Sequence, residues 1–511
     1  MEAREVRLRK GLGRILNVFF LIRRSRRAIF GTSIIVFYIL IALFAPLLTS
    51  NDPVYAQNLA ANYAAPSWYR TLSFEKGLSA NQLVPSQTST GAFDTQDSIS
   101  QYTLTTNNPG AVSFQYSPTV GHNAPGSLQV NVAPRTSGSI YGGINFTVES
   151  RFNYPYDGPP GRFVGTGSVL FHLSGATPST VAALFTIDRI GNQSYRVGSA
   201  DSLAQQPYNI WYTPNPQIDS LDSSLQTSSI FRAASQRGIL PNALVFSSIG
   251  TYSFKLLVTI VDADLSQPFS GTIYVDDISL RLYGTSYGLL GTDYVGRDLF
   301  SQLVYGARVS LLVGLLAAGI AVGVGLVVGL VAGFKAGVLD EVLMRFTDML
   351  LVLPGLPLIL VLVAILSPSL TSIITVIALL GWMGFARVIR SQVVTLKERP
   401  FVEASRAVGA GTGHLIRQHI LPNVMGLTYV SLATSVPAAI TLEAALSFLG
   451  LFDPFVMSWG RILNNAESFQ GFFFWWWFVP PGISIALLSL SFILVGYGID
   501  DILNPRLRQR R

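Results

Sequence analysis

Long apolar segments recur along the chain and predict membrane-spanning helices. A helix needs about 20 consecutive apolar residues to cross the hydrocarbon core of a bilayer. The first such segment, AIFGTSIIVFYILIALFAPLL, is too long and begins too far from Met1 for a cleaved signal peptide, so we expect a retained helix. In all, the sequence predicts six spans, at residues 28–48, 308–334, 342–367, 370–389, 424–449 and 476–499.

A long polar region separates the first two spans. Residues 51–290 are rich in Ser, Thr, Asn, Gly and Pro and contain short runs of β-branched and aromatic residues, such as GSLQVNVA and YSFKLLVTIV. About 200 residues are enough for one self-supporting core. We predict an all-β domain, a jelly-roll-like sandwich, over residues 85–284, with residues 50–84 as a connecting segment. The ending IYVDDISLRLYG resembles the last strand of carbohydrate-binding-module sandwiches.

The composition indicates a membrane protein that is not an enzyme. The 511 residues are 49% hydrophobic and only 12% charged, whereas charged residues supply about a quarter of a soluble domain. Cysteine is absent, which excludes disulfides, thiolate metal sites and cysteine nucleophiles. The four histidines show no metal-ligand spacing. We therefore expect no catalytic residue, no metal site and no cofactor.

The position of the charges predicts the topology. The net charge is +7, and Lys and Arg concentrate in residues 1–27, 386–422 and 500–511. Basic clusters that flank apolar spans are typical of cytoplasmic segments, so they do not indicate a nucleic-acid-binding surface. With six spans, both basic tails lie in the cytoplasm and residues 50–290 lie outside the cell.

A polar segment, FVEASRAVGAGTGHLIRQHILP, interrupts the apolar pattern at residues 401–422. Pro400 suits the first turn of a helix, and the helix dipole favours Glu403 near that end. Glycines from Gly409 onward permit a sharp reversal, and Pro422 is expected to end the second amphipathic segment. The pattern predicts a short helix-turn-helix at the cytoplasmic face. It is either a docking site for another protein or an amphipathic loop on lipid headgroups.

The same segment resembles the EAA motif of importer-type ATP-binding-cassette permeases. The matching residues are Glu403, Ala404, Ser405, Gly409, Ile420, Leu421 and Pro422. Ser405 stands where the motif usually has a second alanine, which is a small-for-small difference. The segments GTDYVGRDLFSQLVYGARVSLLVG, LEAALSFLGL and DDILNPRLR also resemble, in the expected order, the C-type permease of the dipeptide/oligopeptide/nickel family.

This resemblance implies the architecture and the partners. It implies a first transmembrane helix at 28–49 and a permease core with five more helices at 285–499. The coupling loop, 398–422, would seat in a cleft of an ATPase subunit, with Glu403 facing a basic residue there. The implied partners are a second homologous permease, two cytoplasmic ATPase subunits and an extracytoplasmic solute-binding protein, assembled in the cell membrane. Family members usually join the first two spans by a few dozen residues, so the outer domain is a departure.

The chain shows no nucleotide-binding motif. A phosphate-binding loop needs the pattern GxxxxGK[ST], which does not occur. The glycines Gly325, Gly329 and Gly333 lie four residues apart, on one helical face within a predicted span, and favour close helix packing. ATP hydrolysis is therefore expected in partner subunits.

Three charged residues in or beside the spans need separate interpretations. Glu443 lies near the outer end of the fifth span, where it either lines a gate or reaches the outer interface. Arg345 and Asp348 are spaced to form a structural ion pair on one helix.

The pattern as a whole predicts the permease subunit of an ATP-driven importer for short peptides or oligosaccharides. The alternative is a membrane-anchored receptor or adhesin whose β-sandwich is the functional part, but it requires one anchor and does not explain residues 401–422. An ion-coupled carrier would need paired charges in the middle of its spans, which are almost lacking.

Overall fold

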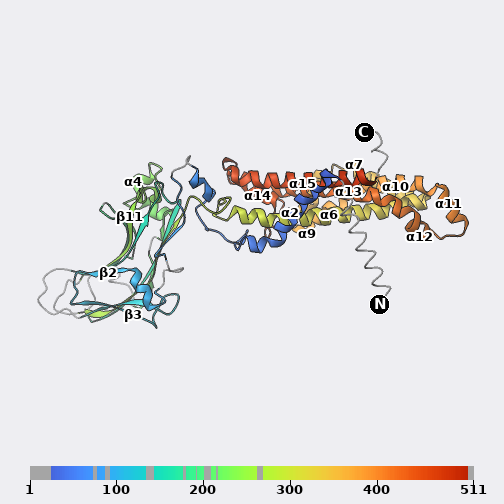
Figure 1. Cartoon of the computed structure of the whole chain (residues 1–511). Coiled ribbons are helices and arrows are strands. Elements are labelled where there is room, and N and C mark those ends of the chain that lie inside the picture. Colours follow the sequence, from blue (N-terminus) through green and yellow to red (C-terminus); the bar gives the residue numbers. More distant parts are fainter. Residues whose placement is uncertain are drawn as a thin grey trace, which may run out of the picture. The chain divides into compact units, whose positions relative to one another are not determined.

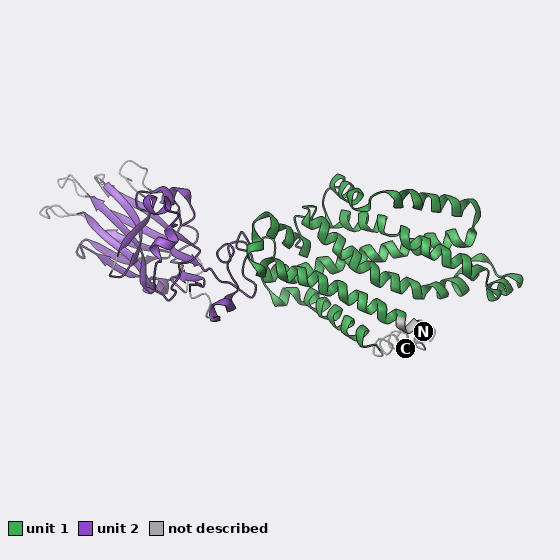
Figure 2. Cartoon of the chain, turned by 90° about the horizontal axis from the view of Figure 1, so that it is seen from above, with its two compact units in different colours: residues 1–56, 298–511 green, residues 57–297 purple. Residues whose placement is uncertain are grey.

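The chain forms two compact units, shown in Figure 2. Unit 1 comprises residues 1–56 and 298–511 and is helical, and unit 2 comprises residues 57–297 and consists mainly of β-strands. Most of the two predicted basic tails, 1–27 and 500–511, lies outside the described residues. The computed structural model describes residues 25–72, 77–86, 93–133, 143–175, 180–191, 193–200, 209–214, 217–261 and 269–503.

The long helices of unit 1 lie side by side, with α11 and α12 at one end and α14 toward the other (Figure 1). Helix α6 is central and packs against α2, α9, α10 and α13. The helices are α2 (Arg26–Leu48), α6 (Leu299–Lys335), α7 (Gly337–Val352), α8 (Gly355–Ile365), α9 (Leu370–Gly381), α10 (Met383–Lys397), α11 (Pro400–Ala407), α12 (Thr412–Leu415), α13 (Leu421–Phe448), α14 (Trp459–Ser468) and α15 (Trp475–Leu503).

Several helices are long and apolar enough to cross a membrane. Among the described residues there are five: Arg26–Leu48, Leu299–Lys335, Leu370–Lys397, Thr412–Phe448 and Trp475–Asp500. The predicted span at 342–367 instead forms two helices, α7 and α8, bent by 91° at their junction. Pro354 disfavours a helical conformation at the preceding residue, and Leu353 has an extended ψ of 137°. The count is six only if this bent pair is one span.

Unit 2 contains two antiparallel sheets. The seven-stranded sheet has the order β10-β6-β12-β4-β3, with β1 also paired to β12 and β9 to β6, and the five-stranded sheet has the order β2-β5-β11-β7-β8. The strands are β1 (Gln82–Val84), β2 (Thr103–Thr106), β3 (Val112–Ser117), β4 (Ser127–Val132), β5 (Ile144–Tyr154), β6 (Arg162–Gly175), β7 (Thr180–Arg189), β8 (Ser194–Ala200), β9 (Trp211–Tyr212), β10 (Ile218–Asp219), β11 (Gly250–Val261) and β12 (Phe269–Tyr283). Three short helices precede β11: α3 (Ser223–Thr227), α4 (Arg232–Ser235) and α5 (Pro241–Val245).

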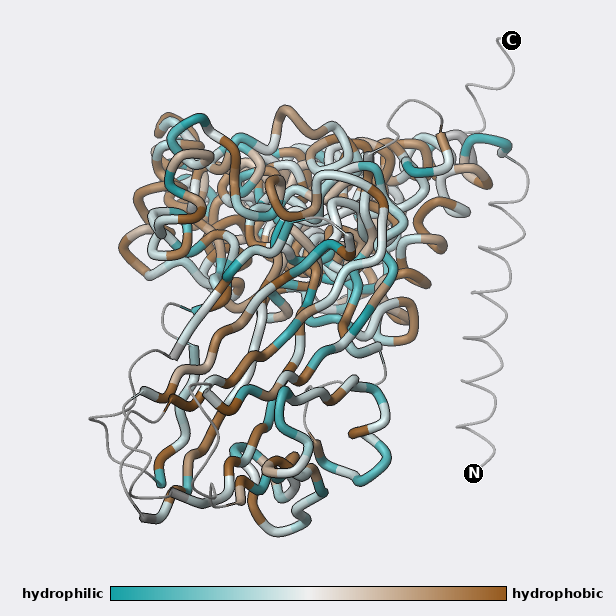
Figure 3. Tube along the Cα trace, turned by 90° about the vertical axis from the view of Figure 1, so that its left-hand side faces the viewer, coloured by the Kyte–Doolittle hydropathy of each residue, from teal (hydrophilic) through white to brown (hydrophobic). Residues whose placement is uncertain are grey.

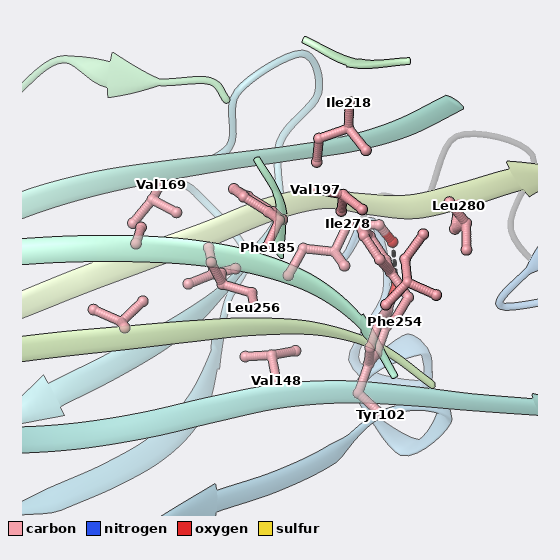
Figure 4. Close-up of a cluster of buried hydrophobic side chains, with 14 of the residues drawn as sticks. Tyr102, Val148, Val169, Phe185, Val197, Ile218, Phe254, Leu256, Ile278 and Leu280 are labelled. Carbon is pink, nitrogen blue, oxygen red and sulfur yellow. Dashed lines mark hydrogen bonds between the residues drawn. The ribbon is translucent and has the colours of Figure 1, made fainter. Parts of the chain in front are cut away.

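One hydrophobic core lies between the two sheets. Every second residue of β7 is buried, as the period of a strand with one inward face requires, and Figure 3 shows hydrophobic and hydrophilic residues alternating along the strands. Val169 and Leu280 of the larger sheet meet Phe185 and Phe254 of the smaller one in this core (Figure 4). A β-sheet-rich region between the first two spans is thereby confirmed, whereas its jelly-roll character stays a prediction.

The compact unit extends beyond the predicted boundaries of the β-domain. Strand β1 pairs with the last strand, β12, although it lies in the segment predicted to be a connector. Farther upstream, the N–H of Ala61 donates to the carbonyl of Gly284 at 3.1 Å and that of Ala65 to Thr285 at 2.8 Å. Both ends of the insertion are therefore held within unit 2, which spans residues 57–297 rather than 85–284.

Candidate functional site

Helix α11 ends in a cap that depends on a glycine. Gly409 has a φ of 88°, which glycine adopts without steric cost. Its N–H donates to the carbonyl of Arg406 at 2.9 Å, and the N–H of Ala410 donates to the carbonyl of Ser405 at 3.1 Å. These two bonds are the Schellman pattern, which satisfies the last carbonyls of the helix. The chain can therefore reverse directly after α11.

The two faces of α11 have different surroundings. On the inner face, Val402 is fully buried in a cluster with Leu330 of α6 and Val393 of α10. On the outer face, Phe401 is 45% exposed and Val408 is 87% exposed, and Ala404 between them is exposed as well. These spacings of three and four residues align the side chains in one strip, and Glu403 of the same helix is exposed as well. An apolar strip of this kind is a surface that another protein can cover.

The second half of the predicted helix-turn-helix does not stop at Pro422. Helix α12 passes through a π-helical turn, Ile416–Ile420, directly into α13, so the expectation that Pro422 ends this segment is wrong. The N–H of Leu421 bonds to the carbonyl of Ile416, five residues back. Proline lacks an N–H and crowds the carbonyl four residues earlier, and a single π turn accommodates it without breaking the helix.

A side-chain contact joins α11 to this π turn. The Oγ of Ser405 lies 3.2 Å from Nε2 of His419. Ile420 is fully buried in the same cluster as Val402, and Leu421 packs against it. The motif residues at the two ends of the loop are therefore brought together in space, although more than ten positions separate them in the sequence.

The three spaced glycines of α6 lie against the backbone of α10. A Cβ atom added at Gly325, Gly329 or Gly333 would lie 2.7, 2.6 or 2.8 Å from the carbonyl oxygens of Trp382, Ala386 and Arg390, respectively. These three carbonyls are themselves four residues apart, so each glycine meets one successive turn of α10. Any side chain at these positions would force the two helices apart.

Two ion pairs join α7 to α10. The Nε and one terminal nitrogen of Arg390 donate to the two carboxylate oxygens of Asp340, both at 2.6 Å. Arg387 pairs with Asp348. The predicted pair between Arg345 and Asp348 is therefore wrong, because Arg345 bonds to Glu341 at 2.7 Å instead. Sequence spacing suggested a partner on the same helix, whereas α10 supplies a guanidinium from far along the chain.

Glu443 is buried near the opposite end of α13. It is 1% exposed, and its Oε1 accepts a hydrogen bond from Ser447 at 2.8 Å. Ser458, at the start of α14, lies 3.5 Å from Ser447. In this conformation the carboxylate does not line an open passage, and its role in a gate stays a prediction.

A family model described as "Binding-protein-dependent transport system inner membrane component" matches residues 325–509. Another, described as "N-terminal TM domain of oligopeptide transport permease C", matches residues 18–66. The dipeptide transport system permease protein DppC of Bacillus subtilis (strain 168) is 35% identical over 304 residues, which are 58% of this chain and 93% of that protein. The oligopeptide permease OppC of the same organism is 38% identical over 220 residues, or 43% of this chain and 72% of the relative.

Solved structures match less well. One chain of the MetNI methionine ABC transporter, in an inward-facing conformation, aligns with 40% of this chain and 95% of its own length, at 19% identity and a TM-score of 0.32. The assignment of this chain to a family therefore rests on its sequence relatives alone. The chain belongs to the family of inner-membrane permeases of binding-protein-dependent transport systems, and to its dipeptide and oligopeptide branch.

Proposed function

We propose that this chain is the permease subunit of an ATP-driven importer that carries short peptides across the inner membrane. It works with a second homologous permease, two cytoplasmic ATPase subunits and an extracytoplasmic solute-binding protein. The names of the relatives refer to dipeptides and oligopeptides for those proteins, which favours peptides over the alternative of oligosaccharides. Both termini lie in the cytoplasm, and residues 50–290 lie outside the cell.

The outer strip of α11 is the observation that carries this proposal. Phe401, Ala404 and Val408 form an exposed apolar surface at one end of the helical unit, and the same helix exposes Glu403. The exposed charges on this helix are of both signs, Arg399 and Arg406 as well as Glu403. A surface of mixed charge suits a protein partner, whereas a helix on lipid headgroups favours basic residues. We therefore assign this surface to the ATPase subunit.

The contacts of α11 suggest how a movement of the ATPase reaches the membrane spans. Val402 packs on α6 and α10, so α11 cannot move without pushing against both helices. The loop also continues without a break into α13 through the π turn. A rigid shift of α11 would therefore be transmitted to three spans at once and would rock them between inward-open and outward-open states. Glu443 would become accessible in a state that separates α13 from α14.

The receptor or adhesin alternative has less support. A surface protein of that kind requires one anchoring helix, whereas the described residues contain five helices able to span a membrane. It also leaves the exposed strip of α11 without a role.

Reversing the charge of Glu403 tests the coupling assignment. In a transporter reconstituted with both ATPase subunits, we expect Glu403→Arg to lower substrate-stimulated ATP hydrolysis by roughly tenfold or more, because a like charge replaces an attractive contact. The matched control is Glu341→Arg, which introduces the same charge change at an exposed position of α7, outside the coupling loop. Co-purification of the ATPase subunits gives a second measurement. If Glu403→Arg retains both ATPase subunits and full stimulation, the assignment is wrong.

A further inference from the structure

Both chain ends of unit 2 lie at one end of its two sheets. The segments 57–72 and 284–297 are bonded to each other, for example by the N–H of Asn58, which donates to the carbonyl of Val295 at 3.0 Å. A terminal nitrogen of Arg162, the first residue of β6, donates to Oδ1 of Asn58 at 2.9 Å. We call the end at which β6 begins and both segments lie the tethered end of unit 2.

The short helices of unit 2 lie at the same end. Strand β10, which precedes them, pairs with the beginning of β6. In α5, Nδ2 of Asn242 donates to the carbonyl of Pro160 at 2.7 Å, just before β6. Strand β11, which follows the helices, begins at Gly250 opposite Tyr154, the last residue of β5. Residues 220–249 therefore belong to the tethered end.

Exposed apolar side chains gather at the tethered end. The turn after β7 also lies there, because the N–H of Ile190 donates to the carbonyl of Thr251 at 3.0 Å and Arg189 donates to that of Ile249 at 3.1 Å. Among the large apolar side chains that are exposed in the described part of unit 2, all but Ile210 and Val261 lie at this end. A gathering of this kind marks a surface that another molecule or a membrane covers.

Trp68 and Leu289 are held side by side on this surface. The indole N–H of Trp68 donates to the carbonyl of Leu289 at 2.9 Å, and the N–H of Ser67 donates to that of Gly288 at 2.9 Å. The side chains of Trp68 and Leu289 are 38% and 57% exposed. Tryptophan is enriched where lipid headgroups meet the hydrocarbon core, and an adjacent leucine adds apolar area at that depth.

The exposed charges at the tethered end are mainly basic. Arg70, Arg232 and Arg237 are exposed, whereas Asp157 is the exposed acid among the described residues there. Arg70 lies over the ring of Tyr156, 6.0 Å from its centre. Basic residues among apolar ones are typical of surfaces that lie on anionic lipid headgroups.

The chain itself keeps this surface near a bilayer. Residues 49–56 alone join α2 to unit 2, and α6 begins at Leu299, directly after the unit ends. A membrane linked in this way acts at a high effective concentration, so scattered contacts are enough. A soluble partner needs about 800 Å² of complementary surface, whereas exposed serines and threonines of residues 223–229 separate the apolar side chains here.

We propose that the tethered end of unit 2 lies on the outer headgroup layer of the membrane, with Trp68 and Leu289 at the boundary of the acyl chains and Arg232 and Arg237 at anionic headgroups. This contact limits the rotation of unit 2 about its two linkers. It goes beyond the proposed function, because it does not depend on what the transporter carries.

Fluorescent labels on single cysteines test the contact. Because the chain has no cysteine, Leu289→Cys and Ile239→Cys each carry one nitrobenzoxadiazole label. The full chain is placed in nanodiscs of phosphatidylcholine and phosphatidylglycerol, with plain or brominated acyl chains. Bromine quenches only nearby fluorophores, so we expect brominated lipid to lower the emission of both labels by roughly twofold or more. The control is Val261→Cys, exposed at the opposite end of β11, whose emission should not change.

The arginines are tested in the Leu289→Cys background. Replacing both by glutamine, Arg232→Gln with Arg237→Gln, should lower the ratio of docked to undocked unit 2 by roughly tenfold in anionic nanodiscs. High salt should weaken the docking of the wild-type arginines in the same direction. In nanodiscs of phosphatidylcholine alone, which have no net charge, the two forms should give equal quenching.

Each outcome decides for or against lipid contact. Quenching of the labels at Leu289→Cys and Ile239→Cys, without quenching at Val261→Cys, supports it. Unchanged emission at either of the first two positions overturns it. If those labels are shielded only after the purified solute-binding protein is added, the surface docks a protein and the inference is wrong. Equal quenching with and without the two arginines in anionic nanodiscs overturns their assignment to headgroups.

Discussion

Gly409 and Gly411 lie two residues apart in the same turn, yet only Gly409 needs to be glycine. Gly409 has a φ of 88°, which side-chain-bearing residues rarely adopt, whereas Gly411 has a φ of −72°. At both positions an added Cβ would meet no atom within 4 Å. The two positions therefore separate the effect of backbone conformation from that of steric contact.

We expect Gly409→Ala to destabilise the cap of α11 by about 1–2 kcal/mol, the cost of a left-handed conformation for alanine. Hydrogen exchange of residues 400–410 in the intact chain should then be faster. Gly411→Ala is the control and should leave exchange unchanged. Equal exchange in the two variants would show that the Schellman cap does not order this helix.

Glu149 of β5 belongs to a charge network that crosses three strands. Its carboxylate accepts a hydrogen bond from Arg151 at 3.0 Å and lies 3.5 Å from Nζ of Lys255, which lies 2.7 Å from Asp188. Burial by itself raises the pKa of Glu149. The hydrogen bond from Arg151 and the positive charge of Lys255 outweigh burial, so the pKa is lowered.

A lowered pKa predicts the pH dependence of this network. Because the folded pKa lies below the unfolded value of about 4.3, ionised Glu149 stabilises unit 2 above that pH. This contribution is lost as the pH falls through the folded pKa. In Glu149→Gln, hydrogen exchange of β5 and β11 in the intact chain should depend less on pH below about 5. The exposed control Asp97→Asn should follow the wild type, and the same pH profile in Glu149→Gln would contradict the assignment.

At the scale of elements, the close contact between α6 and α10 depends on glycines of α6, which have no side chain. Gly329 meets the carbonyl of Ala386 across the contact, whereas Gly323, on the same helix, has no atom within 4 Å of an added Cβ. Lipid tails are as apolar as apolar side chains, so the hydrophobic effect does not hold helices together inside a membrane. Close approach of the helix backbones is therefore a main source of helix association there. The spacing of the glycines in α6 thus matches the path of α10.

We expect Gly329→Ala to destabilise unit 1 by about 1–3 kcal/mol through overpacking, partly offset by the better helix propensity of alanine. Gly323→Ala should be neutral or slightly stabilising, because it gains propensity without a clash. Thermal unfolding of the isolated chain in detergent measures both variants. Equal melting temperatures would show that α10 shifts away at no cost.

At the scale of the whole molecule, unit 2 is an insertion into a membrane permease. The two family models match residues 18–66 and 325–509, almost entirely outside it. The flanks of the insertion are connected within unit 1, because the hydroxyls of Thr49 and Ser301 bond to each other. Arg308 of α6 also donates to the carbonyl of Ala42, which has no helical partner because Pro46 lacks an N–H.

Replacing residues 57–297 by a short Gly/Ser linker should therefore leave unit 1 folded and coupled. We expect the shortened chain to assemble with its ATPase subunits and to keep basal ATP hydrolysis within about twofold of the wild type, because surface insertions contribute little to the stability of the unit that carries them. The measurements are size-exclusion profiles and ATPase rates. Failure to assemble would show that unit 2 is part of the permease core.

The sequence predicted several long apolar helices correctly because they depend on a local pattern, and Gly409, predicted to permit a reversal, has a left-handed φ. It did not predict the bend after Val352, although Pro354 marks that position. It also assigned Asp348 to Arg345, since spacing along one helix identifies only local partners. The contact between His122 and Asp277 had no signal in the sequence, because the two residues lie more than 100 positions apart.

The length of the apolar segments and the turn at Gly409 were determined by the sequence alone. A helix that crosses a bilayer needs consecutive apolar residues, and a left-handed backbone favours glycine at one position. The tertiary structure decided which helices meet and which carboxylate pairs with which guanidinium. Those features depend on packing between distant segments, and the energy of such a contact is set by geometry that neither segment specifies by itself.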